Sequence, residues 1–327
     1  MYHPESNVSS SFIEPYLPIL NAIPDSVQAL VPEASSRKYY RLFFKEDTKI
    51  LCTDPNFQGE NSDFFLIQKL YKKENLPVPE IYSYSKDLKA YLISDSGELD
   101  LSFIKDKKKK DKYLKKSIDL ILSIQKLPKE KPASSRSFDF TKLSFEVNMT
   151  FLKYEAFHID YPDFPDVNIE LRAFFENLCY ILASFSEKVL CHRDYHSRNL
   201  LINKKEQLGI IDFQDTMLGT PFYDLSSLLY DAYNPLSHEE REEYYQYFIS
   251  RFKEKKGVRK IYMEQALQRS FKALGSYFFL FHEKRIFKYK ESLIPCVNNL
   301  LEICQKGFFP DSLFLFLSNL RSSLESL

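Results

Sequence analysis

The sequence lacks an excess of charge of either sign. Its 45 lysines and arginines are balanced by 45 aspartates and glutamates. No global electrostatic field therefore attracts a nucleic acid or a membrane surface, and charge-guided binding must be local. The lysine-rich run at residues 105–116 leads into an amphipathic pattern and is not interleaved with aromatic residues, so we interpret it as the solvated start of a helix.

The sequence also lacks paired cysteines and long hydrophobic runs. None of the five cysteines forms a C-x-x-C pair or has zinc-finger spacing to histidine, which fits reduced thiols in a cytosol. The first eleven residues have neither a basic start nor an apolar stretch, and no later apolar run is long enough to span a bilayer. We expect a soluble, cytoplasmic protein without a membrane or nucleic-acid partner. A chain of 327 residues can bury a core without disulfides.

Local patterns predict an α+β fold of two lobes. Stretches rich in β-branched and aromatic residues at 39–44 and 48–53 predict a hairpin, followed by a helix at 63–73 and strands at 81–85 and 90–93. Helical periodicity dominates afterwards, at residues 112–126, 143–157, 167–185, 239–255, 263–284 and 292–305. We expect a β-rich N-terminal nucleotide-binding lobe at residues 1–96 and a helical catalytic and substrate-binding lobe at residues 97–327.

One segment, residues 189–215, concentrates the polar residues that carry chemistry. His192, Arg193 and Asp194 open it, Asn199 follows five positions after the aspartate, and Asp212-Phe213 comes directly after a predicted strand. Two short apolar strands at 200–202 and 208–211 separate these groups, so a hairpin can bring them to one surface. This order is typical of kinases and is far more specific than a single glycine-rich loop.

Phosphoryl transfer explains why these residue types are needed. The transition state is loose and charge-rich, so catalysis depends on positioning and electrostatics. Asp194 is the candidate base that receives the hydroxyl proton. Asn199 and Asp212 are candidate oxygen ligands of Mg²⁺ ions that bridge the phosphates of ATP. The alternative interpretation treats Asp194 and Asn199 as turn formers and Asp212 as an ordinary residue after a strand.

The segment after Asp212 favours a small-molecule substrate. A protein kinase needs a long activation segment at this point, whereas Pro221 comes only nine residues after Asp212. A helix is predicted at 223–230, with Asp224 either as its N-cap or as a brace for the catalytic loop.

These motifs resemble the aminoglycoside phosphotransferase (APH) family. The runs at 192–199, 212–215 and 223–229 are most similar to the branch of anomeric kinases that act on N-acetylmuramate and N-acetylglucosamine in cell-wall recycling, and further similarity lies at 34–41, 78–80, 92–97 and 268–282. The resemblance implies a protein-kinase-like bilobal fold. It also implies that a turn with Ser36, Arg37 and Lys38 covers the ATP phosphates and that a segment with Ser94 and Asp95 holds adenine through its backbone.

Two departures from the kinase pattern concern the phosphate-binding groups. The strand that usually carries a lysine has Cys52 or Thr53 at that place, which leaves Arg37, Lys38, Arg41 or Lys49 to supply the positive charge. The phosphate turn has no glycine and presents Ala34, Ser35 and Ser36 instead. An exposed, solvated turn is the alternative interpretation of Arg37 and Lys38.

His196, Arg198 and Asp215 are candidate contacts to the acceptor. Such donors and acceptors suit a sugar that carries hydroxyls or a carboxylate. Alternatively, His196 bonds a backbone carbonyl, Arg198 pairs with Asp194, and Asp215 serves as an extra metal ligand or a brace.

The leading hypothesis is ATP- and Mg²⁺-dependent phosphorylation of the anomeric hydroxyl of an N-acetylated amino sugar. An anomeric hydroxyl is more acidic than an ordinary alcohol, so a carboxylate base is adequate. A nucleotidyltransferase is the expected partner downstream.

Two rival hypotheses remain. A kinase of another hydroxyl compound, such as an aminoglycoside, choline or a thiosugar, shares the core motif. Cationic acceptors would call for an acidic or aromatic cage, which the tyrosines and glutamates at 239–247 could form. The absent lysine motivates the other rival, a nucleotide-binding regulator without catalysis.

Overall fold

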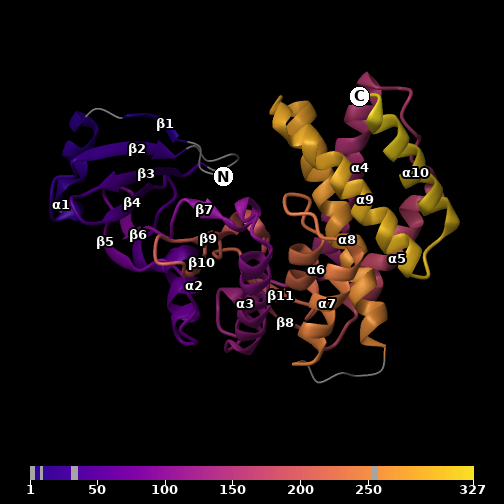
Figure 1. The fold of residues 1–327 in the computed structure, drawn as a ribbon, viewed down its shortest axis with the longest axis horizontal. Helices are drawn as coiled ribbons and strands as arrows, with labels where there is room; N and C mark the ends of the chain where they lie inside the picture. Colours follow the sequence, from indigo (N-terminus) through magenta and orange to yellow (C-terminus); the bar gives the residue numbers. More distant parts are fainter. Residues whose placement is uncertain (1–3, 8–9, 31–35, 252–256) are drawn as a thin grey trace. The chain divides into compact units, whose positions relative to one another are not determined.

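The computed structural model describes residues 4–7, 10–30, 36–251 and 257–327. Contacts within the chain define two compact units, of which unit 1 comprises residues 1–113 and 198–215, and unit 2 comprises residues 114–197 and 216–327. Unit 1 contains most of the strands and unit 2 most of the helices (Figure 1), which confirms the predicted α+β class. The division into functional lobes near residue 96 remains a prediction. The compact units are divided differently, because unit 1 also contains residues 97–113 and the segment that carries Asn199 and Asp212.

Unit 1 contains a six-stranded antiparallel sheet with strand order β1-β2-β3-β4-β6-β5. Its strands are β1 (Pro4–Asn7), β2 (Ser26–Leu30), β3 (Lys38–Phe43), β4 (Thr48–Thr53), β5 (Ile81–Ser85) and β6 (Ala90–Ser94). The hairpin predicted at 39–53 is β3–β4, in which Phe43 pairs with Thr48. Outside the sheet, unit 1 has α1 (Leu17–Leu20) and α2 (Asp63–Lys72), with short turns η1 (Ser10–Tyr16), η2 (Gly59–Asn61) and η3 (Leu101–Phe103).

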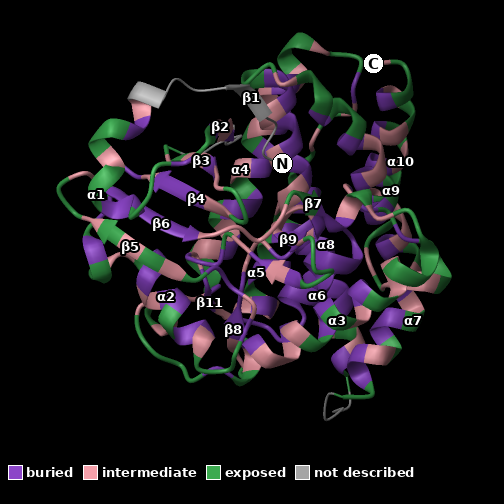
Figure 2. Cartoon of the chain, turned by 60° about the vertical axis from the view of Figure 1, so that its left-hand side comes forward, coloured by how far each residue is buried: buried purple, intermediate pink, exposed green. Residues whose placement is uncertain are grey.

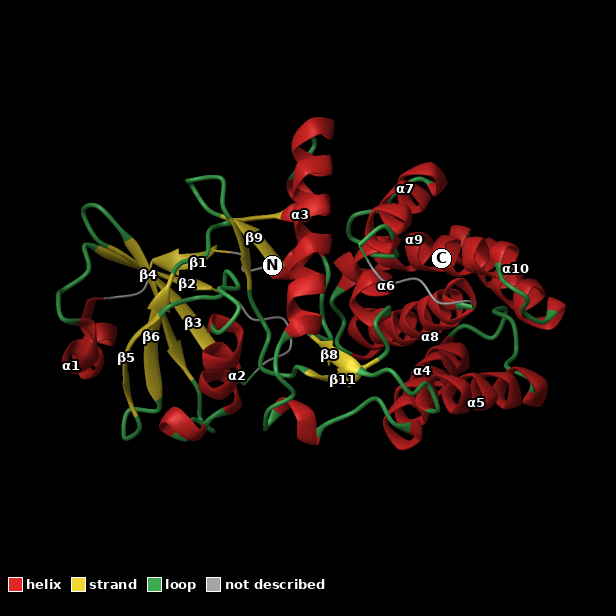
Figure 3. Cartoon of the chain, turned by 90° about the horizontal axis from the view of Figure 1, so that it is seen from below, coloured by secondary structure: helices red, strands yellow, loops and turns green. Residues whose placement is uncertain are grey.

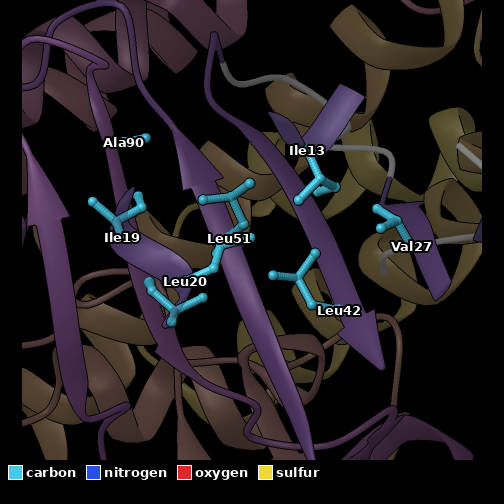
Figure 4. Close-up of a cluster of buried hydrophobic side chains, with 8 residues drawn as sticks. Ile13, Ile19, Leu20, Val27, Leu42, Leu51 and Ala90 are labelled. Carbon is cyan, nitrogen blue, oxygen red and sulfur yellow. The ribbon is translucent and has the colours of Figure 1, made fainter. Parts of the chain in front are cut away.

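One face of the sheet packs against η1 and α1. Figure 4 shows Leu42 and Leu51 of the hairpin facing Ile13, Ile19 and Leu20 of those short helical segments. Leu42 and Leu51 are fully buried, and burial of each stabilises the fold by about 1.5–3 kcal/mol. This core stabilises the predicted hairpin as part of the sheet.

A second, three-stranded sheet of unit 1 holds the two strands that lie between Asn199 and Asp212. It has the order β10-β9-β7, formed by β7 (Leu99–Asp100), β9 (Leu200–Ile202) and β10 (Leu208–Ile210). Gly97 precedes β7 with a φ of +114°, and a Cβ there would lie 2.4 Å from the Ile202 carbonyl oxygen. Only glycine permits this close approach of the two backbones.

Unit 2 is mainly helical (Figure 3). Its helices are α4 (Phe140–Asp160), α5 (Ile169–Ala183), α6 (Tyr223–Leu229), α7 (His238–Ile249), α8 (Val258–Phe278), α9 (Lys290–Lys306) and α10 (Asp311–Glu325), while α3 (Lys107–Lys126) begins in unit 1. Its short helical turns are η4 (Ala133–Ser135), the π-helical η6 (Phe279–Glu283) and η7 (Phe287–Tyr289), while η5 (Ser197–Asn199) begins at the last residue of this stretch of unit 2 and continues into unit 1. A two-stranded sheet pairs β8 (Val189–Cys191) with β11 (Met217–Gly219).

The starts of α4, α5 and α7 follow from local signals. Asp139 and Asn168 cap α4 and α5, and Ser237 and Glu240 form the predicted capping box of α7. Helix α8 is buried along most of its length (Figure 2), so it forms the centre of unit 2. Among the described residues, no helix has the length and apolar character needed to cross a membrane.

One predicted cap is wrong. Helix α6 begins after Phe222, which caps it without a side-chain hydrogen bond, and Asp224 lies inside the first turn. The side chain of Asp224 is instead used by the loop at 192–193, the alternative role considered for it. The expected turn residues Ala34 and Ser35 lie outside the described residues.

Candidate active site

The loop after β8 carries Asp194 and is fixed by two buried aspartates of unit 2. Asp224 accepts hydrogen bonds from the backbone N–H groups of His192, at 2.7 Å, and Arg193, at 3.0 Å. Asp231 accepts hydrogen bonds from the N–H of Ser197, at 2.8 Å, and from the Ser197 hydroxyl. Both carboxylates are almost completely buried. Because they satisfy loop donors on both sides of Asp194, they hold the backbone around it.

Backbone conformation adds to the precision of this loop. Arg193 has a φ of +85°, in a region that side chains other than glycine rarely adopt. The Tyr195 hydroxyl donates to the Ser117 carbonyl oxygen at 2.9 Å, which anchors the residue that follows Asp194. Strained backbone of this kind is frequent at functional sites, where the surrounding contacts maintain it.

Asp194 lies beside two cations of helix α8. The Lys272 Nζ is 3.5 Å and the Arg269 Nη2 is 3.7 Å from the same oxygen, Oδ1. Burial raises the pKa of Asp194, but the positive charges of Lys272 and Arg269 outweigh it and hold the pKa well below its usual range. Asp194 is therefore a carboxylate near neutral pH, and its side chain keeps 26% of its surface exposed. It can accept a hydrogen bond from a hydroxyl.

Unit 1 brings Asn199 next to the segment that carries Asp212. The β9–β10 pairing continues beyond Ile210, because the Ile211 N–H donates to the Asn199 carbonyl oxygen at 3.1 Å. Asp212 follows with a φ of +64°, and its Oδ1 accepts a hydrogen bond from Gln214 Nε2 at 2.7 Å. The predicted hairpin thus brings together the backbone at the start of β9, where Asn199 lies, and the backbone just after β10, where Asp212 lies.

The side chains of Asn199 and Asp212 offer the oxygen donors that Mg²⁺ prefers. Among the described residues, no three histidine, cysteine or acidic side chains form a cluster that could hold a metal. Sites that bind Mg²⁺ through one or two protein oxygens together with substrate phosphates need no such cluster. The donor set therefore fits a metal that binds with a nucleotide.

Asp212 is one of the residues that line a pocket in unit 1. Tyr39, Arg41 and Ile50 line it from the sheet, residues 94–97 from the connection after β6, and residues 211–214 from the end of β10. Ser94 and Asp95, the predicted adenine contacts, thus lie in one pocket with Asp212. The Asp95 carboxylate accepts hydrogen bonds from Arg41 Nε at 2.6 Å and from the Gly97 N–H at 2.9 Å.

Arg41 braces this connection. Its Nη2 donates to the Gly97 carbonyl oxygen at 3.1 Å in addition to the pair with Asp95. Burial raises the pKa of Asp95, but the hydrogen bond and the positive charge of Arg41 outweigh this effect, so the pKa is lowered overall. An ion pair in which both side chains are over nine-tenths buried fixes the shape of the pocket.

The other cation candidates are placed differently. Arg37 forms an ion pair with Asp54 at 3.0 Å, and Lys49 Nζ lies 5.0 Å from the ring centre of Tyr82. Ser36 and Lys38 are exposed, at the start of β3. Cys52, which stands where a kinase lysine was expected, is fully buried, and burial raises the pKa of its thiol to about 12. The thiol is therefore neutral and supplies no charge.

The three candidate acceptor contacts are all half-buried. His196 packs its ring edge-on to Tyr233, with ring centres 5.5 Å apart. Arg198 lies in η5, and Asp215 lies in the turn before β11. Contact with a substrate remains a prediction for all three.

Sequence reasoning missed Arg269, Lys272 and Asp231. Arg269 and Lys272 fall in a predicted helix, where a basic residue is ordinarily solvated. The available signal was position: Arg269 and Lys272 are three residues apart, on the face of α8 that also buries Gln265 and Gln268. Asp231 follows the short α6 helix and carried no motif of its own.

A comparison with protein families explains this arrangement. The sequence profile of the phosphotransferase enzyme family, APH, matches residues 27–259. The chain belongs to this family. The resemblance stated from the motifs at 192–199 and 212–215 is confirmed.

Named relatives of this phosphotransferase-family chain are sugar kinases. An N-acetylmuramate/N-acetylglucosamine kinase of Pseudomonas putida is 28% identical over 211 residues, which are 64% of this chain and 60% of that protein. A protein of the same name from Neisseria meningitidis is 23% identical over 294 residues, 84% of each chain. The chain thus matches less than two thirds of the length of the Pseudomonas relative.

Solved structures confirm the protein-kinase-like fold. Spectinomycin phosphotransferase in complex with ADP and spectinomycin superposes with a TM-score of 0.62 at 14% identity, covering 99% of this chain and 100% of that one. Choline kinase LicA from Streptococcus pneumoniae gives a TM-score of 0.60 at 16% identity and covers 89% and 98%. At these identities the likeness shows the fold and not the substrate.

The Asp224 brace can be tested by replacing it with asparagine. Asp224→Asn retains one acceptor oxygen and turns an amide donor toward a loop N–H, so one buried backbone donor loses its partner. The free energy of unfolding should fall by about 1–3 kcal/mol, measured by urea denaturation. Asp163→Asn, at an exposed position of unit 2, is the matched control. Equal stability of both variants would contradict the brace.

Proposed function

We propose that the chain is an ATP- and Mg²⁺-dependent small-molecule kinase that phosphorylates the anomeric hydroxyl of an N-acetylated amino sugar to give the sugar 1-phosphate. Membership of the phosphotransferase family and the names of its relatives support the reaction class. Phosphoryl transfer converts the acceptor O–H bond into an O–P bond and breaks the bond between the γ-phosphorus and its bridging oxygen in ATP. The proton of the hydroxyl passes to a base.

The ionised Asp194 carries this proposal. A carboxylate with a lowered pKa is a weak base, but it is a good acceptor that orients the hydroxyl oxygen toward an electrophile. In a loose transition state the acceptor oxygen forms little bond to phosphorus, so orientation contributes more than strong basicity. An anomeric hydroxyl, more acidic than an ordinary alcohol, suits such a base.

The pocket of unit 1 is the proposed nucleotide site. The backbone of Ser94 and Asp95 would hold adenine, and the Arg41 brace keeps that backbone in place. Ser36, Arg37 and Lys38 are proposed to contact the phosphates from the start of β3. The Asn199 and Asp212 oxygens would hold Mg²⁺, which supplies neutralisation of phosphate charge when bound.

The charge around Asp194 favours an acceptor that is not cationic. An aminoglycoside or choline would meet Arg269 and Lys272 next to the base, which is repulsive. The glutamates and tyrosines considered as a cationic cage are used elsewhere: Glu242 pairs with Arg259 at 2.7 Å, and the guanidinium of Arg251 lies 3.6 Å from the ring centre of Tyr247. A hydroxyl-rich or carboxylate-bearing sugar, contacted by His196, Arg198 and Asp215, meets no such repulsion.

A sugar 1-phosphate is a suitable substrate for a further enzyme. Its phosphate can attack a nucleoside triphosphate, so a nucleotidyltransferase is the proposed next enzyme. A kinase of a thiosugar and a non-catalytic nucleotide-binding regulator are the competing outcomes of the test below.

Turnover over a substrate panel tests the proposal. ATP consumption with Mg²⁺ is measured for N-acetylmuramate, N-acetylglucosamine, glucose, a thiosugar, choline and an aminoglycoside, and phosphorus NMR locates the new phosphate. We expect a sugar 1-phosphate from the N-acetylated sugars and loss of turnover when EDTA removes the metal. Turnover only with choline or an aminoglycoside would refute the sugar assignment, and nucleotide binding without any turnover would favour the regulator.

Asp194→Asn tests the base. The amide cannot take up the proton, so kcat should fall by roughly 10²- to 10⁴-fold while ATP still binds. Nucleotide binding is measured by calorimetry, as the control for folding of unit 1. Undiminished turnover would remove Asp194 from the reaction.

A further inference from the structure

Helix α8 presents two cations to a single carboxylate. Arg269 and Lys272 are three residues apart and therefore lie on one face of the helix. Both approach the same oxygen of Asp194, at 3.7 and 3.5 Å. Their side chains retain only 8% and 20% of their surface in contact with solvent.

Arg269 has one buried donor that no described residue accepts from. Its Nε is buried and has no hydrogen-bond partner among the described residues. The 3.7 Å approach of its Nη2 to Asp194 is an ion pair, longer than a hydrogen bond. A guanidinium has five donors, and a buried donor without an acceptor costs about 1–3 kcal/mol, which an anion bound at Arg269 would offset.

The nearby charges leave this place positive. Arg193 is a third cation that acts on Asp194 and on Lys272. The other carboxylate that acts on both α8 cations, Glu146, has its own partners: Lys142 lies at 3.6 Å, and Gln268 Nε2 donates to it at 3.4 Å. Burial, with the like charge of Arg269, lowers the pKa of Lys272 although Asp194 opposes this shift. A second anion would therefore be stabilising.

The scaffold holds the two cations rigidly. The Thr220 hydroxyl donates to Gln265 Oε1 at 2.7 Å, and Gln265 Nε2 donates to Gln268 Oε1 at 3.0 Å, which links α8 to the β11–α6 connection. Gly275 lets the same helix approach α4 closely, since a Cβ there would lie 2.5 Å from Thr150 Oγ1. The cations are thus positioned before any ligand arrives.

We propose that Arg269 and Lys272 form an oxyanion subsite for a small molecule bound beside the hydroxyl that Asp194 accepts. The inference rests on the proposed function and adds the anionic group that the site takes. Two sources have this chemistry: a carboxylate on the acceptor sugar, or the phosphoryl oxygens of the group being transferred. Arg269 offers paired N–H donors suited to either, and Lys272 adds a point charge.

Three variants at the subsite and one control variant test the proposal. Arg269→Gln and Lys272→Met remove one charge each, and Lys260→Met removes an exposed lysine of the same helix as the matched control. Arg269→Lys keeps the charge without the paired donors. Urea denaturation checks that each variant folds.

Steady-state kinetics with two sugars distinguish the sources. N-acetylmuramate carries a carboxylate and N-acetylglucosamine does not. If the subsite binds the acceptor, both charge-removing variants should raise KM for N-acetylmuramate by roughly 10- to 100-fold more than they raise KM for N-acetylglucosamine. If it binds the phosphoryl group, kcat should fall by a similar factor for both sugars, with sugar KM unchanged. Arg269→Lys should recover part of either loss.

Kinetic constants equal to those of Lys260→Met on both sugars would overturn the subsite. If the wild-type chain turns over no sugar, the proposed function fails, and anion binding then tests the subsite independently of turnover. Calorimetry then compares N-acetylmuramate and inorganic phosphate on the wild type and on Arg269→Gln. Binding of either anion that weakens in the variant supports the subsite, and binding that is absent or equal in both refutes it.

Discussion

The ion cluster of Asp194 with Arg269 and Lys272 is the interaction on which the proposed chemistry of this chain depends. Burial alone would raise the pKa of Asp194, and the positive charges of Lys272 and Arg269 outweigh that shift. With them, the group is a carboxylate, and its surroundings are positive instead of neutral. In the proposed reaction, the same two charges that keep Asp194 ionised also disfavour cationic acceptors, so the proposal links mechanism to specificity through one contact.

The rest of unit 2 keeps this cluster in place. Asp224 and Asp231 fix the loop by accepting hydrogen bonds from its backbone N–H groups, while the hydrogen-bonded Gln265 and Gln268 and the close approach at Gly275 fix helix α8. Unit 1 is organised around a different ion pair, that of Arg41 and Asp95, which braces the pocket. Each unit thus has a buried or partly buried ion pair at the residues proposed to carry its part of the reaction.

Much of this could be predicted from the sequence, because strong local signals carried it. The hairpin at 39–53, the capping box at 237–240 and the order of Asp194, Asn199 and Asp212 all depend on near neighbours in the chain. The roles of Arg269, Asp231 and Arg41 depend on long-range packing, which no local pattern encodes. Asp224 illustrates the limit: its place at the start of a helix suggested a cap, but the partners that decided its role are 31 and 32 positions away.

Carbon-13 NMR of aspartate-labelled protein tests the central claim most directly, with the Asp194 carboxyl signal assigned by its loss in Asp194→Asn. A lowered pKa means that the ion pairs stabilise the fold at every pH above the pKa of an unfolded aspartate and lose this contribution as the pH falls toward the folded value. The account predicts that the Asp194 signal stays at its ionised position as the pH falls from about 7 to about 4, while exposed aspartates begin to titrate. Titration of Asp194 at or above the ordinary aspartate range would contradict it.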